Sequence, residues 1–205
     1  MTSLRAKQKA QRRVMIEQAA SQLFEKNGFS VTTIEDIAEK ALVSPATVYN
    51  YYGNKGELLL ALVAHGEEGT RAKVKEFGVR ANSEDPVELL ADIMGSNMQD
   101  TLKYMSRELW GHVVAYVATT SDPEVAPRYL AGIADDLAAA LGVAIQQYCD
   151  LGVFKKVDAH HFAYLMTRLE RNHFLAFVYV KSMTVEEMLQ NMKKDVDLLV
   201  QTLRV

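Results

Sequence analysis

Residues 32–59 read TTIEDIAEKALVSPATVYNYYGNKGELL, and this stretch decides the fold. Its first helix can be capped by Thr32 or Thr33, because an acidic residue follows three positions later, Glu35 or Asp36. That spacing is typical of a capping box, in which two side chains satisfy backbone N–H groups at a helix start. The apolar residues that follow recur at helical spacing, so a short helix is predicted directly after the threonines.

A second helix is predicted to begin at Ser44–Pro45. Serine is a good N-cap, and proline fits the first helical position, whose N–H needs no partner. The turn at residues 41–44 is tight, and four apolar residues can hold the two helices together: Ile37, Ala38, Val43 and Val48. Two short helices joined in this way describe a helix-turn-helix. The second helix of such a unit enters the major groove of DNA by its N-terminal residues.

Helical spacing extends on both sides of this unit. Upstream, apolar residues recur every three to four positions until Asn27–Gly28 supplies a left-handed stop. Downstream, Asn54 with Glu57 can cap a fourth helix that runs on through Gly66 and Gly69. Later starts are predicted at N-cap residues, two of which precede proline: Asp85–Pro86, Asp122–Pro123, Asp158 and Thr184. The predicted fold class is therefore all-α.

Two domains are predicted from this pattern. Residues 1–56 would form an N-terminal three-helix domain that contains the helix-turn-helix, and residues 57–205 a C-terminal helical domain. The polar stretch 78–84 is the best candidate for a linker.

The composition is typical of a soluble globular protein, with 49% hydrophobic and 24% charged residues. No uninterrupted apolar stretch approaches the roughly 20 residues that cross a bilayer, and the N-terminus lacks a secretory pattern. We therefore expect a cytoplasmic protein without a membrane partner. The single Cys149 can form neither an internal disulfide nor a multi-thiolate metal site, and neither a metal nor a cofactor is predicted.

The net charge of -3 is unevenly distributed along the chain. Residues 1–56 contain eight basic and five acidic side chains, a balance of +3, which leaves -6 for the remainder. Five of these bases precede the first acid: Arg5, Lys7, Lys9, Arg12 and Arg13. This asymmetry is expected where one end of a protein faces phosphates, although a solvated basic tail would have the same composition.

The last two predicted helices carry heptad-spaced apolar residues. In a helix that is apolar nearly all round, one side can face the core and another a second subunit. The residues predicted for a homodimer interface are Met166, Leu169, His173, Met192, Val196, Leu199 and Leu203. The alternative is that the first of these helices is fully internal to a monomer.

Three segments resemble the tetracycline-repressor (TetR) family over residues 10–60: TTIEDIA at 32–38, VSPATVYNYY at 43–52 and NKGELL at 54–59. The resemblance implies operator-DNA contacts by Thr33, Ser44, Pro45, Ala46, Thr47, Tyr49, Asn50, Tyr51 and Lys55. The chain departs from the family pattern where glycine is common near Ala46, histidine near Tyr51 and phenylalanine at Tyr52. These departures put any base preference inferred from the family in doubt.

The same resemblance implies a transcriptional repressor that binds DNA as a homodimer and is released by a small molecule bound in the C-terminal domain. Differential binding of about 1.4 kcal/mol would give a tenfold release. Candidate pocket residues are the aromatic, apolar and polar side chains Tyr104, Met105, Glu108, Trp110, His112, Tyr116, Arg168, Arg171, Phe174 and Phe177.

Two other classes of function are alternatives for an all-helical chain. Glu170 and His173 have the Glu-x-x-His spacing of helical di-iron carboxylate enzymes, but such sites need a second motif, which the sequence lacks. Phosphate-binding loops, nucleophile elbows and His-Glu-x-x-His motifs are also missing, so we do not expect an enzyme. A helical protein-interaction scaffold would leave the capped two-helix unit unexplained.

Overall fold

The computed structural model describes residues 4–63, 76–132 and 135–205, and every regular element in these ranges is a helix. Contacts divide the chain into two compact units. Unit 1 comprises Met1–His65 and Met105–Val125, and unit 2 comprises Gly66–Tyr104 and Ala126–Val205. The fold class is all-α, as predicted. The boundary predicted between residues 56 and 57 falls inside a helix of unit 1, and the predicted passage through Gly66 and Gly69 lies outside the described residues.

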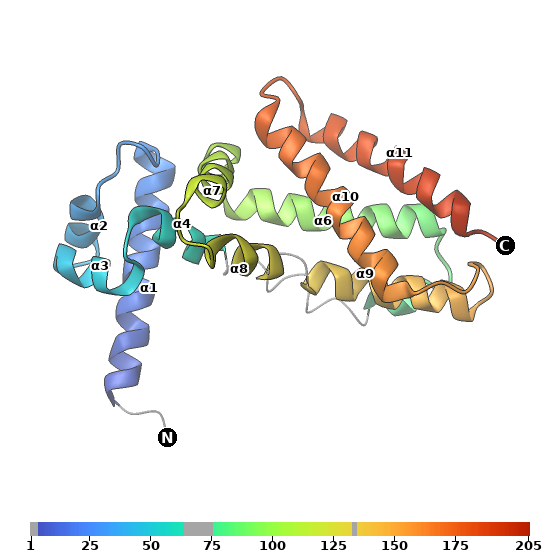
Figure 1. The fold of residues 1–205 in the computed structure, drawn as a ribbon, viewed down its shortest axis with the longest axis horizontal. Helices are drawn as coiled ribbons and strands as arrows, with labels where there is room; N and C mark the ends of the chain where they lie inside the picture. Colours follow the sequence, from blue (N-terminus) through green and yellow to red (C-terminus); the bar gives the residue numbers. More distant parts are fainter. Residues whose placement is uncertain (1–3, 64–75, 133–134) are drawn as a thin grey trace. The chain divides into compact units, whose positions relative to one another are not determined.

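Unit 1 packs five helices (Figure 1): α1 (Leu4–Asn27), α2 (Ile34–Lys40), α3 (Pro45–Tyr52), α4 (Lys55–Val63) and α7 (Arg107–Thr119). Their contacts bury a shared core whose main members are Ile16, Ala20, Phe24, Ile37, Val48, Leu58, Leu59 and Val113. The apolar residues expected to hold the helix-turn-helix together, Ile37, Ala38 and Val48, are all buried, and Val43 is half-buried.

The helix starts of unit 1 confirm the capping predictions. Thr33 and Asp36 form a capping box at α2, and the Ser44 side chain accepts a hydrogen bond from Thr47 N–H at α3. Asn54 Oδ1 accepts from Glu57 N–H at 2.9 Å at the start of α4. Each of these bonds is made between residues three apart, which is why the sequence alone could predict it.

The turn between α2 and α3 is closed by two backbone hydrogen bonds. Val43 N–H donates to Ala38 O at 3.0 Å, and Leu42 N–H donates to Glu39 O at 3.1 Å. This is the Schellman arrangement, whose residue after the C-cap takes a left-handed conformation. Leu42 occupies that position with φ of 55° and an 85% exposed side chain, where glycine is the usual residue.

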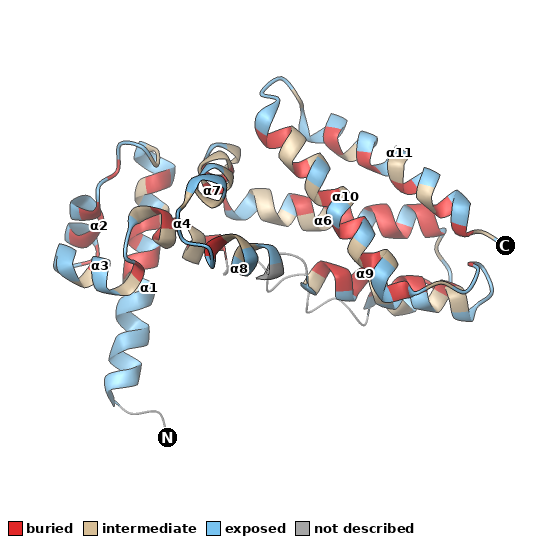
Figure 2. Ribbon diagram, in the orientation of Figure 1, coloured by how far each residue is buried: buried red, intermediate tan, exposed pale blue. Residues whose placement is uncertain are grey.

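Unit 2 is built from α6 (Pro86–Tyr104), α8 (Val125–Gly132), α9 (Asp135–Asp150), α10 (Ala159–Tyr179) and α11 (Val185–Leu203). Helix α10 packs against α9, α11 and α6, and α6 also contacts α9 and α11. The buried side chains line the facing sides of these helices (Figure 2) and include Met94, Met98, Leu141, Ile145, Met166, Met192 and Val196. The predicted caps at Asp158 and Thr184 are confirmed, whereas α8 begins at Val125, two residues after the predicted proline start.

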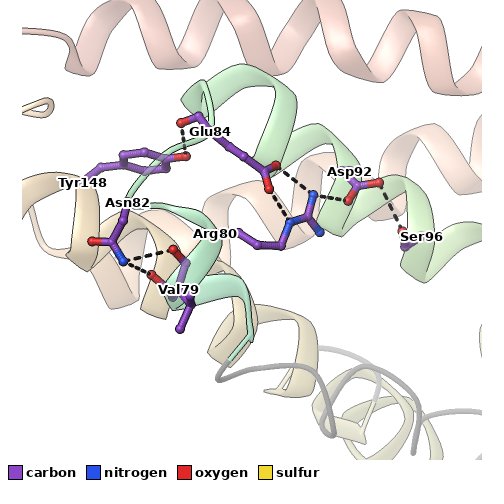
Figure 3. Close-up of polar contacts among 8 residues, drawn as sticks. Val79, Arg80, Asn82, Glu84, Asp92, Ser96 and Tyr148 are labelled. Carbon is purple, nitrogen blue, oxygen red and sulfur yellow. Dashed lines mark hydrogen bonds and ion pairs between the residues drawn. The ribbon is translucent and has the colours of Figure 1, made fainter.

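Residues 78–84, predicted to be a linker, belong instead to the packed structure of unit 2 (Figure 3). The Arg80 guanidinium binds both carboxylate oxygens of Glu84, at 2.7 and 2.8 Å, and Asp92 Oδ2 at 2.8 Å. Tyr148 OH donates to the backbone oxygen of Glu84 at 3.0 Å, and Ala81 is buried. The linker prediction was wrong because polar residues here bind one another and a neighbouring helix, which composition does not reveal.

One stretch, Val125–Asp150, is long and apolar enough on average to cross a membrane by length and composition alone. Its described C-terminal part, α9, buries Leu141, Ala144 and Ile145 in unit 2 and packs on α6 and α10. That burial is typical of the core helix of a globular domain.

Candidate nucleic-acid interface

The N-terminal end of α3 presents small side chains to solvent. Ser44, Pro45 and Ala46 are exposed and Thr47 is half-buried. The hydroxyls of Ser44 and Thr47 share a hydrogen bond of 2.9 Å, which fixes both at the helix start. Small residues allow close approach of another molecule, and a hydroxyl or a helix N-terminus can bind a phosphate.

The outer face of α3 continues with Tyr49 and Asn50. Tyr49 is 47% exposed, and Asn50 is exposed beside it, while Val48 points into the core. An amide and a phenol offer hydrogen bonds to base edges or phosphates, and a helix of this width fits the major groove. The sequence prediction that these two side chains are available for DNA contact therefore agrees with their exposure.

Helix α3 is fixed to α1 by a buried polar group. Tyr52 OH donates to Glu17 Oε1 at 2.9 Å, and Arg13 Nε donates to the same oxygen at 2.9 Å. Burial, with Glu17 as the second cause, raises the pKa of Tyr52, so this phenol stays protonated and remains a donor. Tyr52 is thus part of the domain core. Its hydroxyl donates to Glu17, a hydrogen bond that phenylalanine at this position could not make.

Two other predicted contact residues, Tyr51 and Thr33, form hydrogen bonds within unit 1. Tyr51 is half-buried, and its hydroxyl donates to Lys9 O on α1 at 3.3 Å. Thr33 is exposed, but its hydroxyl donates to Asp36 Oδ2 at 2.7 Å as part of the α2 cap.

The structure gives Lys55 a role that the sequence did not reveal. Its ammonium donates to the backbone oxygens of Phe29 at 2.7 Å, Thr32 at 2.8 Å and Ser30 at 3.4 Å. The same nitrogen lies 4.5 Å from the centroid of the Phe29 ring, and burial lowers the pKa of Lys55. An ammonium has three N–H donors, so Lys55 holds the α1–α2 loop, whereas the sequence prediction placed it on DNA.

Comparison with known proteins identifies this unit. Residues 16–62 match the family model described as "Bacterial regulatory proteins, tetR family", and this range spans the second half of α1, all of α2 and α3, and all but the last residue of α4. The chain has a tetR-family N-terminal domain. The resemblance seen in the sequence is therefore confirmed.

Individual relatives agree with this placement. The regulator HbdR of Aromatoleum sp. (strain CIB) is 43% identical over 49 residues, which are 24% of this chain and 21% of HbdR, so the match spans about a fifth of that curated relative. The Thermus thermophilus TetR-family repressor FadR, solved with lauroyl-CoA, is 23% identical with a TM-score of 0.70 and covers 90% of this chain and 92% of FadR. A TetR-family structure from Mesorhizobium loti is 17% identical with a TM-score of 0.67, covering 96% and 98%. Because both structures are less than 25% identical to this chain, they support its fold alone.

Behind this tetR-family domain, α7 packs on α4 and on the α1–α2 loop. The Tyr116 ring covers Gly56, where an added Cβ would collide with it, and Tyr116 OH donates to Glu57 Oε1 at 3.1 Å. The His112 ring lies 4.8 Å from that of Phe29, the loop residue beneath Lys55. Two residues predicted to line a ligand pocket thus contact the helix-turn-helix domain.

The remaining candidate ligand residues are divided between the two units. Met105, Glu108 and Trp110 belong to unit 1, where Met105 and Trp110 are buried and Glu108 is exposed. Unit 2 holds the buried Phe174 and Phe177, the half-buried Arg171, and the exposed Tyr104 and Arg168.

Unit 2 contains a buried carboxyl that the sequence did not identify as a polar anchor. Glu170 is 8% exposed, and Asn97 Nδ2 donates to its Oε1 at 3.0 Å. Burial raises the pKa of Glu170 to about 7, opposed by the Asn97 bond and the Arg171 charge. His173 binds Asp195 on α11 at 2.8 Å. Glu170 and His173 therefore bind residues of different helices, and no group of three metal-binding side chains occurs among the described residues.

A groove of about 500 Å³ lies on unit 2 between the start of α6 and α11. Two ion pairs cross it, Lys193 with Glu88 and Arg204 with Asp85, both at 2.7 Å. None of the candidate ligand residues lines this groove.

The heptad residues of α10 and α11 divide by burial. Met166, Met192, Val196 and Leu203 lie in the core of unit 2, so they are not available to a second subunit as the spacing had suggested. Leu169, His173 and Leu199 are half-buried. The same two helices expose Leu165 (43%), Tyr179 (61%) and Leu198 (68%). The spacing identified the apolar helices, but the face that packs internally is set by tertiary contacts.

Proposed function

We propose that this chain is a transcriptional repressor that binds operator DNA as a homodimer and is released by a small molecule. The observation that carries the proposal is the exposed N-terminal end of α3, held rigidly by the Ser44 cap and by Tyr52 on Glu17, in a tetR-family domain. A helix-turn-helix reads DNA through this end of its second helix. Such a regulator works in the cytoplasm, where the DNA is.

Dimerisation through α10 and α11 is supported by their exposed apolar residues. Leu165 and Tyr179 on α10 and Leu198 on α11 are exposed apolar side chains of unit 2. Exposed apolar surface of this kind favours association with a second copy. Two reading helices related by twofold symmetry would engage half-sites about one DNA turn apart, roughly 34–36 Å.

The small molecule would bind in unit 2. Phe174 and Phe177 offer apolar surface there, and the Asn97–Glu170 pair offers a polar contact. A pocket of this composition suits a ligand with an apolar portion and one hydrogen-bonding group. Because FadR was solved with lauroyl-CoA, acyl-CoA thioesters are the first compounds to test.

Release of the DNA on ligand binding would depend on α7. Only Met105 and Ser106 separate α6 of unit 2 from α7, whose Tyr116 and His112 contact Gly56 and Phe29. A ligand that moved α6 would thereby act on the start of α4 and on the α1–α2 loop. A thousandfold loss of affinity requires about 4 kcal/mol of differential binding between the two states.

The test is a mobility shift with the full-length protein and DNA from upstream of its own gene, against a random fragment, at two salt concentrations. We expect specific binding that weakens with salt and is lost in Tyr49→Ala and Asn50→Ala. Gln146→Ala, an exposed amide of unit 2, is the matched control and should bind as the wild type does. Equal affinity for both fragments across the salt range would contradict the proposal.

A further inference from the structure

The N-terminal part of α1 extends beyond the packed part of unit 1. Every residue from Leu4 to Val14 is exposed, and α1 first becomes buried at Ile16 (Figure 2). Figure 1 shows this part continuing past α3 toward the N-terminus. Eleven helical residues span about 16 Å, close to the length of five base pairs of duplex. We call residues 4–14 the arm.

The arm is basic on one side. Arg5, Lys9 and Arg12 are spaced four and three residues apart, so they share one face of the helix, and Lys7 lies on the opposite face. The arm contains no acidic residue, and the next acid along the chain, Glu17, is paired with Arg13 at 2.9 Å. Three positive charges therefore face solvent without local compensation.

This basic face adjoins the reading helix. Lys9 contributes its backbone oxygen to Tyr51 OH of α3, and Arg13 shares Glu17 with Tyr52 of α3. Both contacts join the C-terminal half of the arm, at Lys9 and Arg13, to α3. A duplex engaged by the exposed end of α3 thus has the arm beside it.

A solvated tail would explain the charge but not the alignment of three bases on one face of a helical segment that also contacts α3. An isolated helix of this length is marginal in water, and this one carries no buried apolar face along residues 4–14. From these observations we infer that the arm binds the DNA phosphate backbone flanking the bases that α3 reads, through Arg5, Lys9 and Arg12. This inference rests on the proposed DNA-binding function and extends its contact surface.

The experiment measures operator affinity against salt concentration for the full-length protein and for the triple variant Arg5→Gln, Lys9→Gln, Arg12→Gln. Each lost phosphate contact makes the slope of log affinity against log salt shallower by about 0.9, so we expect a change of about 3 per bound protomer. The hydroxyl-radical footprint should shorten at its outer edges, while the preference for operator over random DNA is retained.

Two controls distinguish an effect of the arm from an effect of the protein's net charge. The triple variant Lys156→Gln, Lys181→Gln, Lys194→Gln removes three exposed bases of unit 2 and should keep the wild-type slope. In single variants, Lys9→Gln should change the slope and Lys7→Gln, on the opposite face, should not. Circular dichroism would show that the helix content is unchanged.

The outcomes distinguish this inference from the proposed function. If the wild type binds its operator specifically and the arm variant has the same slope and footprint, the arm inference is overturned and the proposed function stands. If both triple variants change the slope equally, the effect is one of net charge and the inference is again overturned. A wild type without specific binding would overturn the proposed function and, with it, the role of the arm.

Discussion

At the scale of single residues, buried polar groups distinguish the two units. In unit 1, Glu17 receives hydrogen bonds from Arg13 and Tyr52, so its charge is compensated. In unit 2, Glu170 receives a bond from Asn97, and burial raises its pKa to about 7. A charged carboxyl is costly in such a place, and the protonated form is favoured in the folded state.

The raised pKa of Glu170 predicts a pH-dependent stability. Below the ordinary value of 4.5 the group is protonated in both states, and it contributes no penalty. As the pH rises to about 7, the unfolded chain loses this proton while the folded chain keeps it, so stability falls by up to about 3 kcal/mol. Urea unfolding from pH 4.5 to 8 should show Glu170→Gln gaining stability over the wild type across this window. The exposed variant Glu186→Gln should show no such gain.

The inward position of the Lys55 ammonium predicts that this residue contributes to the stability of unit 1. Lys55→Met removes hydrogen bonds to three backbone oxygens of the α1–α2 loop, and we expect a loss of about 1–2 kcal/mol. Lys26→Met, an exposed lysine of the same unit, should change stability by less than about 0.5 kcal/mol. If Lys55→Met kept the wild-type stability but no longer bound DNA, the result would favour the DNA contact that the sequence predicted for Lys55.

At the scale of helices and turns, the α2–α3 turn fixes the angle at which the reading helix is presented. Its two backbone hydrogen bonds require a left-handed residue, and this chain places Leu42 there. A non-glycine residue in that region carries roughly 1–2 kcal/mol of strain. The 85% exposed side chain makes little compensating contact within the chain.

We therefore expect Leu42→Gly to stabilise the protein. Relief of strain exceeds the extra freedom that glycine gives the unfolded chain, for a net gain of about 0.5–1 kcal/mol. The midpoint of chemical denaturation measures this gain, and specific DNA binding should be kept. A loss of stability would mean that the leucine side chain packs against something in solution.

The sequence predicted local features of these elements well and tertiary ones poorly. The caps at Thr33, Ser44, Asn54 and Thr184 depend on residues three positions apart, and all were confirmed. The prediction of a linker at residues 78–84 was wrong because Arg80 forms an ion pair with Asp92 on α6. The inward role of Lys55 depends on a loop more than twenty residues away, which no local pattern encodes.

At the scale of the whole molecule, the proposed dimer depends on surface that the single chain leaves uncovered. Leu198→Glu places a charge on the exposed α11 residue without disturbing the core, so the chain should stay folded but become monomeric. Sedimentation would report 22.9 kDa for the variant and twice this mass for the wild type. Leu151→Glu, an exposed leucine in the α9–α10 loop, should remain dimeric. A dimeric Leu198→Glu would place the interface elsewhere.

The fit of Tyr116 over Gly56 limits how such regulators can diversify. Any side chain at position 56 needs a smaller partner at position 116, so the two positions should change together during evolution. The same constraint applies to chimeric repressors. A DNA-reading segment grafted from this chain onto another sensor domain would keep its geometry only if the recipient's equivalent of α7 leaves room for Gly56 and offers a hydroxyl to Glu57 and Asn54.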